Sequence, residues 1–396
     1  MRLAYLVSKY PAENHAYILR EITGLRARGF EIEVIAISPD DRHPAELNAI
    51  ELSERETTFV VKTRGALGTL SDNLAVFARH PASYVRGLRI AVRLASSDLR
   101  RIGYNLAYLA QAVVAGRRMT QRGLRRLHAH YTSTVALLLG EVFRFEVSAT
   151  IHGSAEFINP ELNRIRDKVK AFDRVVAISK YGRSQLMFNS DPQHWSKIHV
   201  VPLGVHLPCS GAARERPEGH LRIVSVGQLQ PAKGLHILLD AVALLSARNY
   251  KVSVTLVGDG PYKDGLVRHA QSLGIAATVT FTGRLNPDEV QSVYARSDVF
   301  VLASFAEGVP VVLMEAMSNA LPSVATRITG IPELLRDGVD GLLVTPSDSG
   351  ELAEAIASLI DDPERATTMA DSGRTRVGER YNLDTNLDLL ASVLRD

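Results

Sequence analysis

The sequence predicts an α/β protein of two doubly wound domains, each built around a parallel β-sheet. Two observations support this fold class. Short apolar runs rich in Val and Ile alternate with helical patterns along most of the chain, which is typical of strands covered by helices on both faces. A stretch rich in proline, glycine and charge, 208–220, interrupts this alternation and is predicted to be an exposed linker. With 396 residues, the chain is long enough for two cores.

The predicted elements fall into two series. The first has strands at 3–7, 31–37, 124–130, 147–153, 174–179 and 198–204, with a helix near 15–28 and a long, mostly helical stretch over 73–121. The second has strands at 222–227, 252–258, 278–283, 299–304, 322–326 and 341–346, separated by helices. We predict an N-terminal domain over 1–207 and a C-terminal domain over 221–379, with a last helix, about 380–396, that packs back on the first. Ligands of such sheets bind at the carboxyl ends of the strands, so the main site is expected in a cleft between two facing sheets.

The composition indicates where the protein works. The only cysteine is Cys209, so no internal disulfide requires an oxidising compartment. The apolar N-terminal run meets Lys9 and Pro11, far short of the ~20 apolar residues that a membrane span needs. We therefore expect a cytoplasmic location.

Basic residues are concentrated in one part of the chain. Between Arg79 and Arg126 there are eleven arginines and one acidic residue, Asp98, although the whole chain has a net charge of only +3. Helical spacing is expected to place one set of residues on a basic face and another on the opposite, apolar face: Arg86, Arg89, Arg93 and Arg100 against Leu88, Val92, Ala95 and Leu99. We expect this stretch to contact an anionic membrane surface. A merely solvated face is the alternative, whereas nucleic acid is not favoured because no aromatic stacking platform accompanies the charge.

The segment EGVPVVLME is the most informative one for chemistry. It places Glu307 in a loop, Pro310 at a helix start and Glu315 further along that helix. Free amide groups at a helix start favour an anion such as a diphosphate. Eight residues separate the two carboxylates by at most ~12 Å, a span that suits the two ends of a sugar nucleotide. Two glutamates at this spacing are otherwise ordinary solvated charges.

Other motifs do not indicate a cofactor or a metal. The glycines of VGDGPYKDG have the wrong spacing for a dinucleotide-binding turn, and GQLQPAKG lacks the GK[ST] ending of a nucleotide-triphosphate loop. No Asp-x-Asp pair occurs, and the histidines do not cluster with the cysteine at zinc-site spacing. We expect no cofactor besides a sugar-nucleotide co-substrate, and no metal.

Several motifs together resemble the family 4 retaining glycosyltransferases, which have the two-domain GT-B fold. VGQLQPAKG, VGDGP, FTGRL, EGVPVVLME, TGIPELLRDGVDGLLV and PSD occur in the family's order and spacing. The N-terminal half, with LHAHY and IHGSAEF, is similar to the subgroup that builds exopolysaccharides such as colanic acid. The similarity extends over nearly the whole chain.

The resemblance implies roles for residues of the second domain. Glu307 would contact the donor sugar, Glu315 the ribose, and Lys233 the diphosphate. The remaining donor-binding positions would be Gln228, where the family usually has arginine, and the residues around the helix start, namely Gly308, Val309, Val311 and Val312. Lys233 has the alternative role of a solvated lysine at a helix start.

The resemblance also implies roles in the first domain. His152 would lie beside the transferred sugar, where it would steady developing positive charge; without the resemblance, a strand-end capping role is the alternative. His15 stands in the segment SKYPAENHA, which replaces the family's glycine-rich loop near the acceptor. His130 would approach the acceptor, although a structural role is equally compatible with its place at a strand end.

These expectations combine into one function. The protein would transfer a sugar, with retention, from a nucleotide-diphosphate sugar to a saccharide or lipid-linked saccharide in exopolysaccharide or cell-surface glycan synthesis. Two alternatives remain open at this point: a sugar-nucleotide epimerase of the same fold, and a degenerate donor-binding partner subunit.

Overall fold

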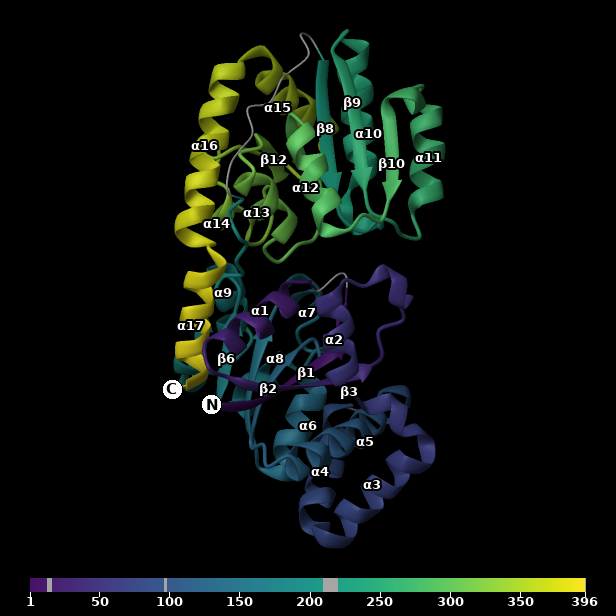
Figure 1. Cartoon of the computed structure of the whole chain (residues 1–396), viewed down its shortest axis with the longest axis vertical. Coiled ribbons are helices and arrows are strands. Elements are labelled where there is room, and N and C mark those ends of the chain that lie inside the picture. The colour runs from purple at the N-terminus through teal and green to yellow at the C-terminus, as the bar shows by residue number, and fades with distance from the viewer. Residues whose placement is uncertain (13–15, 96–97, 209–219, 396) are drawn as a thin grey trace. The chain divides into compact units, whose positions relative to one another are not determined.

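The computed structural model describes residues 1–12, 16–95, 98–208 and 220–395. The predicted linker therefore lies almost wholly outside the described residues. The chain divides into two compact units (Figure 1). Unit 1 comprises Met1–Ile178, Gly182–Val201 and Leu387–Asp396, and unit 2 comprises Ser179–Tyr181 and Pro202–Asn386.

Unit 1 is built on a seven-stranded parallel sheet. Its strands are β1 (Arg2–Lys9), β2 (Glu31–Ser38), β3 (Phe59–Val60), β4 (Arg126–His130), β5 (Glu146–Ile151), β6 (Arg174–Ala177) and β7 (Ile198–Val200). They pair in the order β3-β2-β1-β4-β5-β6-β7. Because β1 lies between β2 and β4, the point where the strand order reverses is at the carboxyl ends of β1 and β4.

Helices surround this sheet. They are α1 (Ala16–Ala27), α2 (Ala49–Thr57), α3 (Gly65–Arg79), α4 (Pro81–Leu94), α5 (Leu99–Gln121), α6 (Ser133–Phe143), α7 (Ser154–Ile158), α8 (Ile165–Ala171) and α9 (Lys180–Phe188). Most of α17 (Leu383–Arg395) also belongs to unit 1. It packs on α1, where Leu387 lies against Gly24 and Asp388 bonds Arg28 at 2.6 Å.

The long helical stretch predicted over 73–121 is three separate helices, α3, α4 and α5. Pro81 begins α4 because proline lacks the N–H that would continue the previous helix. Asp98 caps α5 by accepting hydrogen bonds from the amides of Arg100 and Arg101 at 2.9 and 3.3 Å.

The buried face of α4 is not the apolar face that the spacing indicated. Leu88 and Val92 are exposed, and the buried residues of this helix are Gly87, Ala91 and Leu94. The reason is close packing, because a Cβ on Gly87 would lie 2.5 Å from a methyl of Val142 in α6. The small side chains of Gly87 and Ala91 therefore allow close packing of the buried face, while Leu88 and Val92 lie outside it.

Unit 2 is built on a six-stranded parallel sheet. Its strands are β8 (His220–Val226), β9 (Lys251–Val257), β10 (Val279–Gly283), β11 (Val299–Leu302), β12 (Ser323–Thr326) and β13 (Leu342–Val344). They pair in the order β10-β9-β8-β11-β12-β13. The strand order reverses between β8 and β11, as in doubly wound nucleotide-binding sheets.

The helices of unit 2 cover both faces of its sheet. They are α10 (Leu235–Ala247), α11 (Lys263–Ser272), α12 (Pro287–Arg296), α13 (Val311–Ser318), α14 (Ile331–Leu334), α15 (Ser349–Asp361) and α16 (Pro363–Arg380). The strands and the apolar sides of these helices form one core, in which Leu238, Leu239 and Ile356 are fully buried.

Backbone segments approach each other closely at the carboxyl edge of this sheet. Gly234 has a φ of +58°, and a Cβ there would lie 2.0 Å from the carbonyl oxygen of Ala303, just after β11. A Cβ on Gly258 would lie 2.0 Å from the carbonyl oxygen of Gly227. Only glycine allows the loops after β8, β9 and β11 to lie this near one another.

We expect Gly234→Ala to destabilise the protein for two reasons. A strained backbone conformation costs about 1–3 kcal/mol, and the clash of the new Cβ with the carbonyl oxygen of Ala303 adds to this cost. Chemical denaturation measures this. Gly274→Ala is the matched control, because Gly274 also has a positive φ, +72°, but nothing lies within 4 Å of its would-be Cβ. Equal losses in the two variants would contradict a requirement for close approach.

Candidate functional site

The candidate donor site lies at the carboxyl edge of the unit 2 sheet, where the strand order reverses. Lys233 follows β8 and Glu307 follows the neighbouring strand β11. The Nζ of Lys233 donates to Oε1 of Glu307 at 2.6 Å. The resemblance assigns Lys233 to the diphosphate of the donor and Glu307 to the adjoining sugar. The structure places these two side chains in direct contact.

The position of Glu307 is fixed by hydroxyl groups. Its carboxylate accepts from the Ser304 hydroxyl at 2.7 Å, and its carbonyl oxygen accepts from the Thr329 hydroxyl at 2.7 Å. The carbonyl of Ser304 in turn accepts from the Thr326 hydroxyl at 2.6 Å. These partners hold the nearly buried carboxylate in one orientation.

The start of α13 presents free amide groups beside this pair. Pro310 occupies the N-cap position and provides no side-chain cap. Within the described part of the chain, the amides of Val309, Val311 and Val312 donate no hydrogen bond. Such a helix start attracts an anion, because unsatisfied N–H groups and the helix dipole both favour negative charge.

The other predicted donor residues lie around this helix start. Glu315 is half-buried in the middle of α13, and Gly308 immediately precedes Val309, with its carbonyl oxygen accepting from the Gly330 amide at 3.2 Å. Gln228 is exposed two residues after β8. All of them belong to the same edge of one sheet.

The histidines of unit 1 form a buried chain of hydrogen bonds. His130 ends β4 and His152 follows β5, and their Nδ1 and Nε2 atoms are 2.9 Å apart. The other ring nitrogen of His130 lies 3.0 Å from Oε1 of Glu21, which also accepts from the Tyr5 hydroxyl at 2.7 Å. His15 lies outside the described residues.

Burial raises the pKa of the Glu21 carboxyl, but the two neighbouring histidines, His130 and His128, and the hydrogen bonds from His130 and Tyr5 outweigh it, so the pKa lies below its usual value. Glu21 is therefore a buried carboxylate at neutral pH. An ionised carboxylate only accepts hydrogen bonds, so Nε2 of His130 carries the hydrogen that it donates to Glu21.

Aromatic rings and a second carboxyl group surround His152. The ring of Tyr131 stacks on it, with centroids 4.5 Å apart, and Tyr17 lies 5.3 Å away. The backbone amide of His152 donates to Oε2 of Glu156 at 2.8 Å. Burial raises the pKa of Glu156, and burial also lowers the pKa of the adjacent Lys168 to about 8. These contacts fix both the ring and the backbone of His152.

Glu21, His128 and His130 are the only described residues of unit 1 whose ligand atoms lie close enough together to hold a metal ion, within 4.8 Å. Protein groups already bond every ring nitrogen of the two histidines. His128 lies 2.8 Å from the Ser148 hydroxyl and 2.9 Å from the Thr150 hydroxyl. Burial lowers its pKa to about 3, so His128 is neutral.

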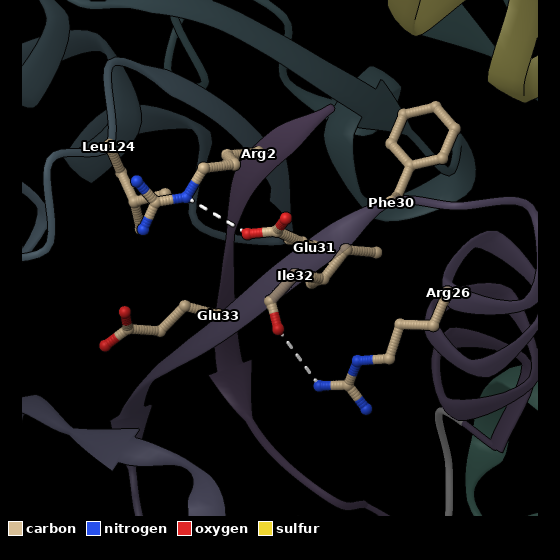
Figure 2. Close-up of a pocket in the computed structure, with 7 residues that line it drawn as sticks. All are labelled: Arg2, Arg26, Phe30, Glu31, Ile32, Glu33 and Leu124. Carbon is tan, nitrogen blue, oxygen red and sulfur yellow. Dashed lines mark hydrogen bonds and ion pairs between the residues drawn. The ribbon is translucent and has the colours of Figure 1, made fainter.

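An open depression of about 440 Å³ lies at the edge of the unit 1 sheet formed by the amino ends of its strands, opposite the edge that carries His130 and His152. Figure 2 shows Arg2 directed at Glu31 and Arg26 directed at the carbonyl of Ile32. These residues lie at or near the amino ends of β1 and β2, whereas ligands of such sheets bind at the carboxyl ends. We therefore do not assign the candidate site to this depression.

Sequence analysis missed several residues of the site. Glu21 had a detectable signal, because it interrupts the apolar stripe of α1 formed by Ile18, Ile22 and Leu25, all buried. A charged residue at such a position needs a buried partner. Ser304 and Thr329 had no comparable signal, since small hydroxyl residues are common in loops.

Known proteins resemble this chain in sequence and in fold. Residues 212–376 match the family model described as glycosyl transferases group 1. WcaL of Escherichia coli K12, assigned as a colanic acid biosynthesis glycosyltransferase, is 26% identical over the full length of both chains. The amylovoran biosynthesis glycosyltransferase AmsK of Erwinia amylovora is 25% identical and matches 100% of this chain and 99% of its own.

A solved structure shares the fold. The crystal structure of Anabaena HepE in complex with UDP and glucose superposes with a TM-score of 0.74, covering 100% of this chain and 99% of the other at 20% identity. The full-length relatives are glycosyltransferases, so the epimerase and partner-subunit alternatives are not favoured. Residues 212–376 therefore form a group 1 glycosyltransferase domain, and the chain as a whole has the GT-B fold.

Proposed function

We propose that this glycosyltransferase transfers a sugar, with retention of configuration, from a nucleoside-diphosphate sugar bound at the carboxyl edge of the unit 2 sheet. The observation that carries the proposal is the contact between Lys233 and Glu307 beside the unpaired amides that begin α13. This arrangement offers a cation and N–H donors to a diphosphate and a fixed carboxylate to sugar hydroxyls. HepE, whose crystal structures contain UDP and UDP-glucose, has the same fold.

In the proposed reaction the bond from the anomeric carbon to the diphosphate breaks. A bond to the acceptor oxygen forms on the same face of the sugar, and the acceptor proton passes to the leaving diphosphate oxygen. Lys233 and the α13 start stabilise the negative charge on the diphosphate. Glu315 binds the ribose, and no metal or other cofactor takes part.

His152 is proposed to act beside the transferred sugar, with its tautomer set by the chain behind it. Nε2 of His130 donates to Glu21, and Nδ1 of His130 shares a hydrogen bond with Nε2 of His152 at 2.9 Å, so the carboxylate and the two rings form one chain. The hydrogen between the two rings is proposed to depend on Glu21. The ring of His152 would hydrogen-bond a sugar hydroxyl and favour positive charge nearby.

The acceptor is proposed to be a saccharide or lipid-linked saccharide of exopolysaccharide synthesis, and the enzyme to work at the cytoplasmic face of a membrane. The names of WcaL and AmsK support the pathway class. No described helix is long and apolar enough to cross a membrane. Contact with lipid is therefore proposed to be peripheral, through the basic stretch Arg79–Arg126.

The donor site is tested first by a thermal-shift screen of sugar nucleotides, in which a ligand at ~100 times its Kd adds ~2.7 kcal/mol of stability. With the best ligand, we expect Lys233→Ala and Glu315→Ala to weaken binding by about 10- to 100-fold, because contacts to charged groups contribute about 1.5–3 kcal/mol. Glu307→Ala should mainly lower kcat. The control is Lys251→Ala, at the amino end of β9, which should bind the ligand as the wild type does. Wild-type kinetics in Lys233→Ala, Glu315→Ala and Glu307→Ala would refute the site.

Transfer is expected to continue unchanged in excess EDTA, since Lys233 and the α13 amides supply the positive charge. Metal analysis of the purified protein by mass spectrometry should find no stoichiometric ion. Activity lost in EDTA and restored by manganese or magnesium would contradict metal independence. Stoichiometric zinc abolished by His128→Gln would instead assign a metal to Glu21, His128 and His130.

Glu21→Gln is expected to disturb the tautomer of His152 without unfolding the protein, because glutamine keeps the size but can also donate a hydrogen bond. NMR of ring-¹⁵N-labelled histidine measures this directly. The signals of His130 and His152 should move, whereas those of His128, bonded to Ser148 and Thr150, serve as the internal control. Unchanged His152 signals would show that Glu21 does not set its tautomer.

A further inference from the structure

Helix α3 has its apolar side directed away from the protein. Leu67, Leu70, Leu74 and Phe77 are separated by three, four and three residues, so they lie on one face of the helix. Their exposed fractions are 46–84%. We call these four residues the outward stripe. A helix that packs on a core normally buries such a stripe.

The buried residues of α3 are Asp72, Asn73 and Val76, of which the first two are polar. Asp72 bonds Arg64 at 3.0 Å and Arg117 of α5 at 2.8 Å. The amide group of Asn73 donates to the carbonyl oxygen of Ala110 at 3.3 Å, and its oxygen accepts from the Tyr84 hydroxyl at 3.2 Å.

These contacts fix the rotation of the helix. Turning α3 to bury the outward stripe would separate Asp72 from both arginines and carry Asn73 away from its partners. Each buried polar group left unsatisfied in this way would cost about 1–3 kcal/mol. The exposure of the stripe is therefore built into the fold of unit 1.

The part of the chain that carries the stripe is rich in positive charge. Residues 62–118, which include α3, α4 and most of α5, contain ten basic residues and two acidic ones. Seven of the eleven arginines between Arg79 and Arg126 form a salt bridge with an acidic residue of unit 1. One of them, Arg86, also donates to the carbonyl oxygen of Glu141 at 2.7 Å. In contrast, some exposed cations of these helices and the turn before them make no salt bridge with any described residue: Lys62, Arg79, Arg89 and Arg100.

We propose that α3 is the part of this protein that enters a membrane surface, with the outward stripe among the lipid acyl chains and the unpaired cations on anionic headgroups. An apolar helix face bordered by arginine and lysine is suited to lie in the plane of that interface. A second copy of the chain is a poor occupant, because two surfaces with this excess of basic residues repel each other. The inference rests on the proposed function for its biological setting and names the surface that meets the lipid.

The test is sedimentation of the full chain with vesicles of phosphatidylcholine containing 30% phosphatidylglycerol by design. Leu67→Ser, Leu70→Ser and Leu74→Ser combined should lower the partition coefficient by about tenfold or more, because each leucine loses its apolar contact with lipid. The matched control combines Ile50→Ser, Phe188→Ser and Leu389→Ser, which are 43–85% exposed elsewhere in unit 1. This control should bind vesicles as the wild type does.

A second measurement reports insertion itself. Trp195 is the only tryptophan of the chain, so a variant that combines Trp195→Phe with Leu70→Trp has a single tryptophan, in α3. On vesicle binding its fluorescence emission should shift to the blue, and lipids brominated in the acyl chain should quench it. Absence of quenching, or equal binding by the triple variant and the wild type, would overturn the proposal. The proposal would also be overturned if the wild type were a dimer and the triple serine variant a monomer, because the stripe would then be a contact between two copies of the chain.

These outcomes are separable from those of the donor site. The triple serine variant should keep the wild-type thermal shift with sugar nucleotides, because α3 and the donor residues belong to different units. Loss of vesicle binding with an unchanged thermal shift supports the proposal for α3. A protein that binds vesicles through α3 but no sugar nucleotide would refute the proposed donor site while supporting the membrane surface.

Discussion

In both units the first strand lies inside the sheet, between the second and the fourth, and the position of every candidate site residue depends on this order. The chain leaves β1 toward β2 and leaves β8 toward β9, whereas β4 and β11 pair on the opposite sides. Right-handed crossovers then place the following helices on opposite faces of the sheet. The loops diverge at the carboxyl edge, and side chains from sequence-distant strands meet there.

Each unit buries a carboxylate at this edge. Glu307 is neutralised by Lys233 and held by Ser304, and Glu21 is held by His130 and Tyr5. A buried charge that loses its partner costs about 3–5 kcal/mol, so each carboxylate keeps one position before any ligand arrives. Such fixed groups act on a bound sugar without first having to reorganise.

Most of the fold could be predicted from the sequence, whereas the donor-binding roles of Lys233, Glu307 and Glu315 remain predictions. Strands covered on both faces produce continuous apolar runs. The spacing of Glu307 and Glu315 is informative only together with the other motifs that resemble the family. Glu21 could not be assigned a role without structure, because its partner His130 is 109 residues away. The faces of α3 and α4 were also beyond prediction. In these helices, periodicity identifies an apolar side, but glycine packing and buried polar pairs decide which side faces inward.

The return of α17 to the first unit affects how the protein folds as it leaves the ribosome. Leu387 and Asp388 complete the surface of α1 at Gly24 and Arg28, and the Arg395 guanidinium lies 5.0 Å from the ring centre of Phe30. These contacts become available only after the residues of unit 2 have been translated, because α17 follows them in the chain. The first unit to be synthesised is therefore completed only after the second, and a chain truncated before α17 leaves this surface of α1 uncovered.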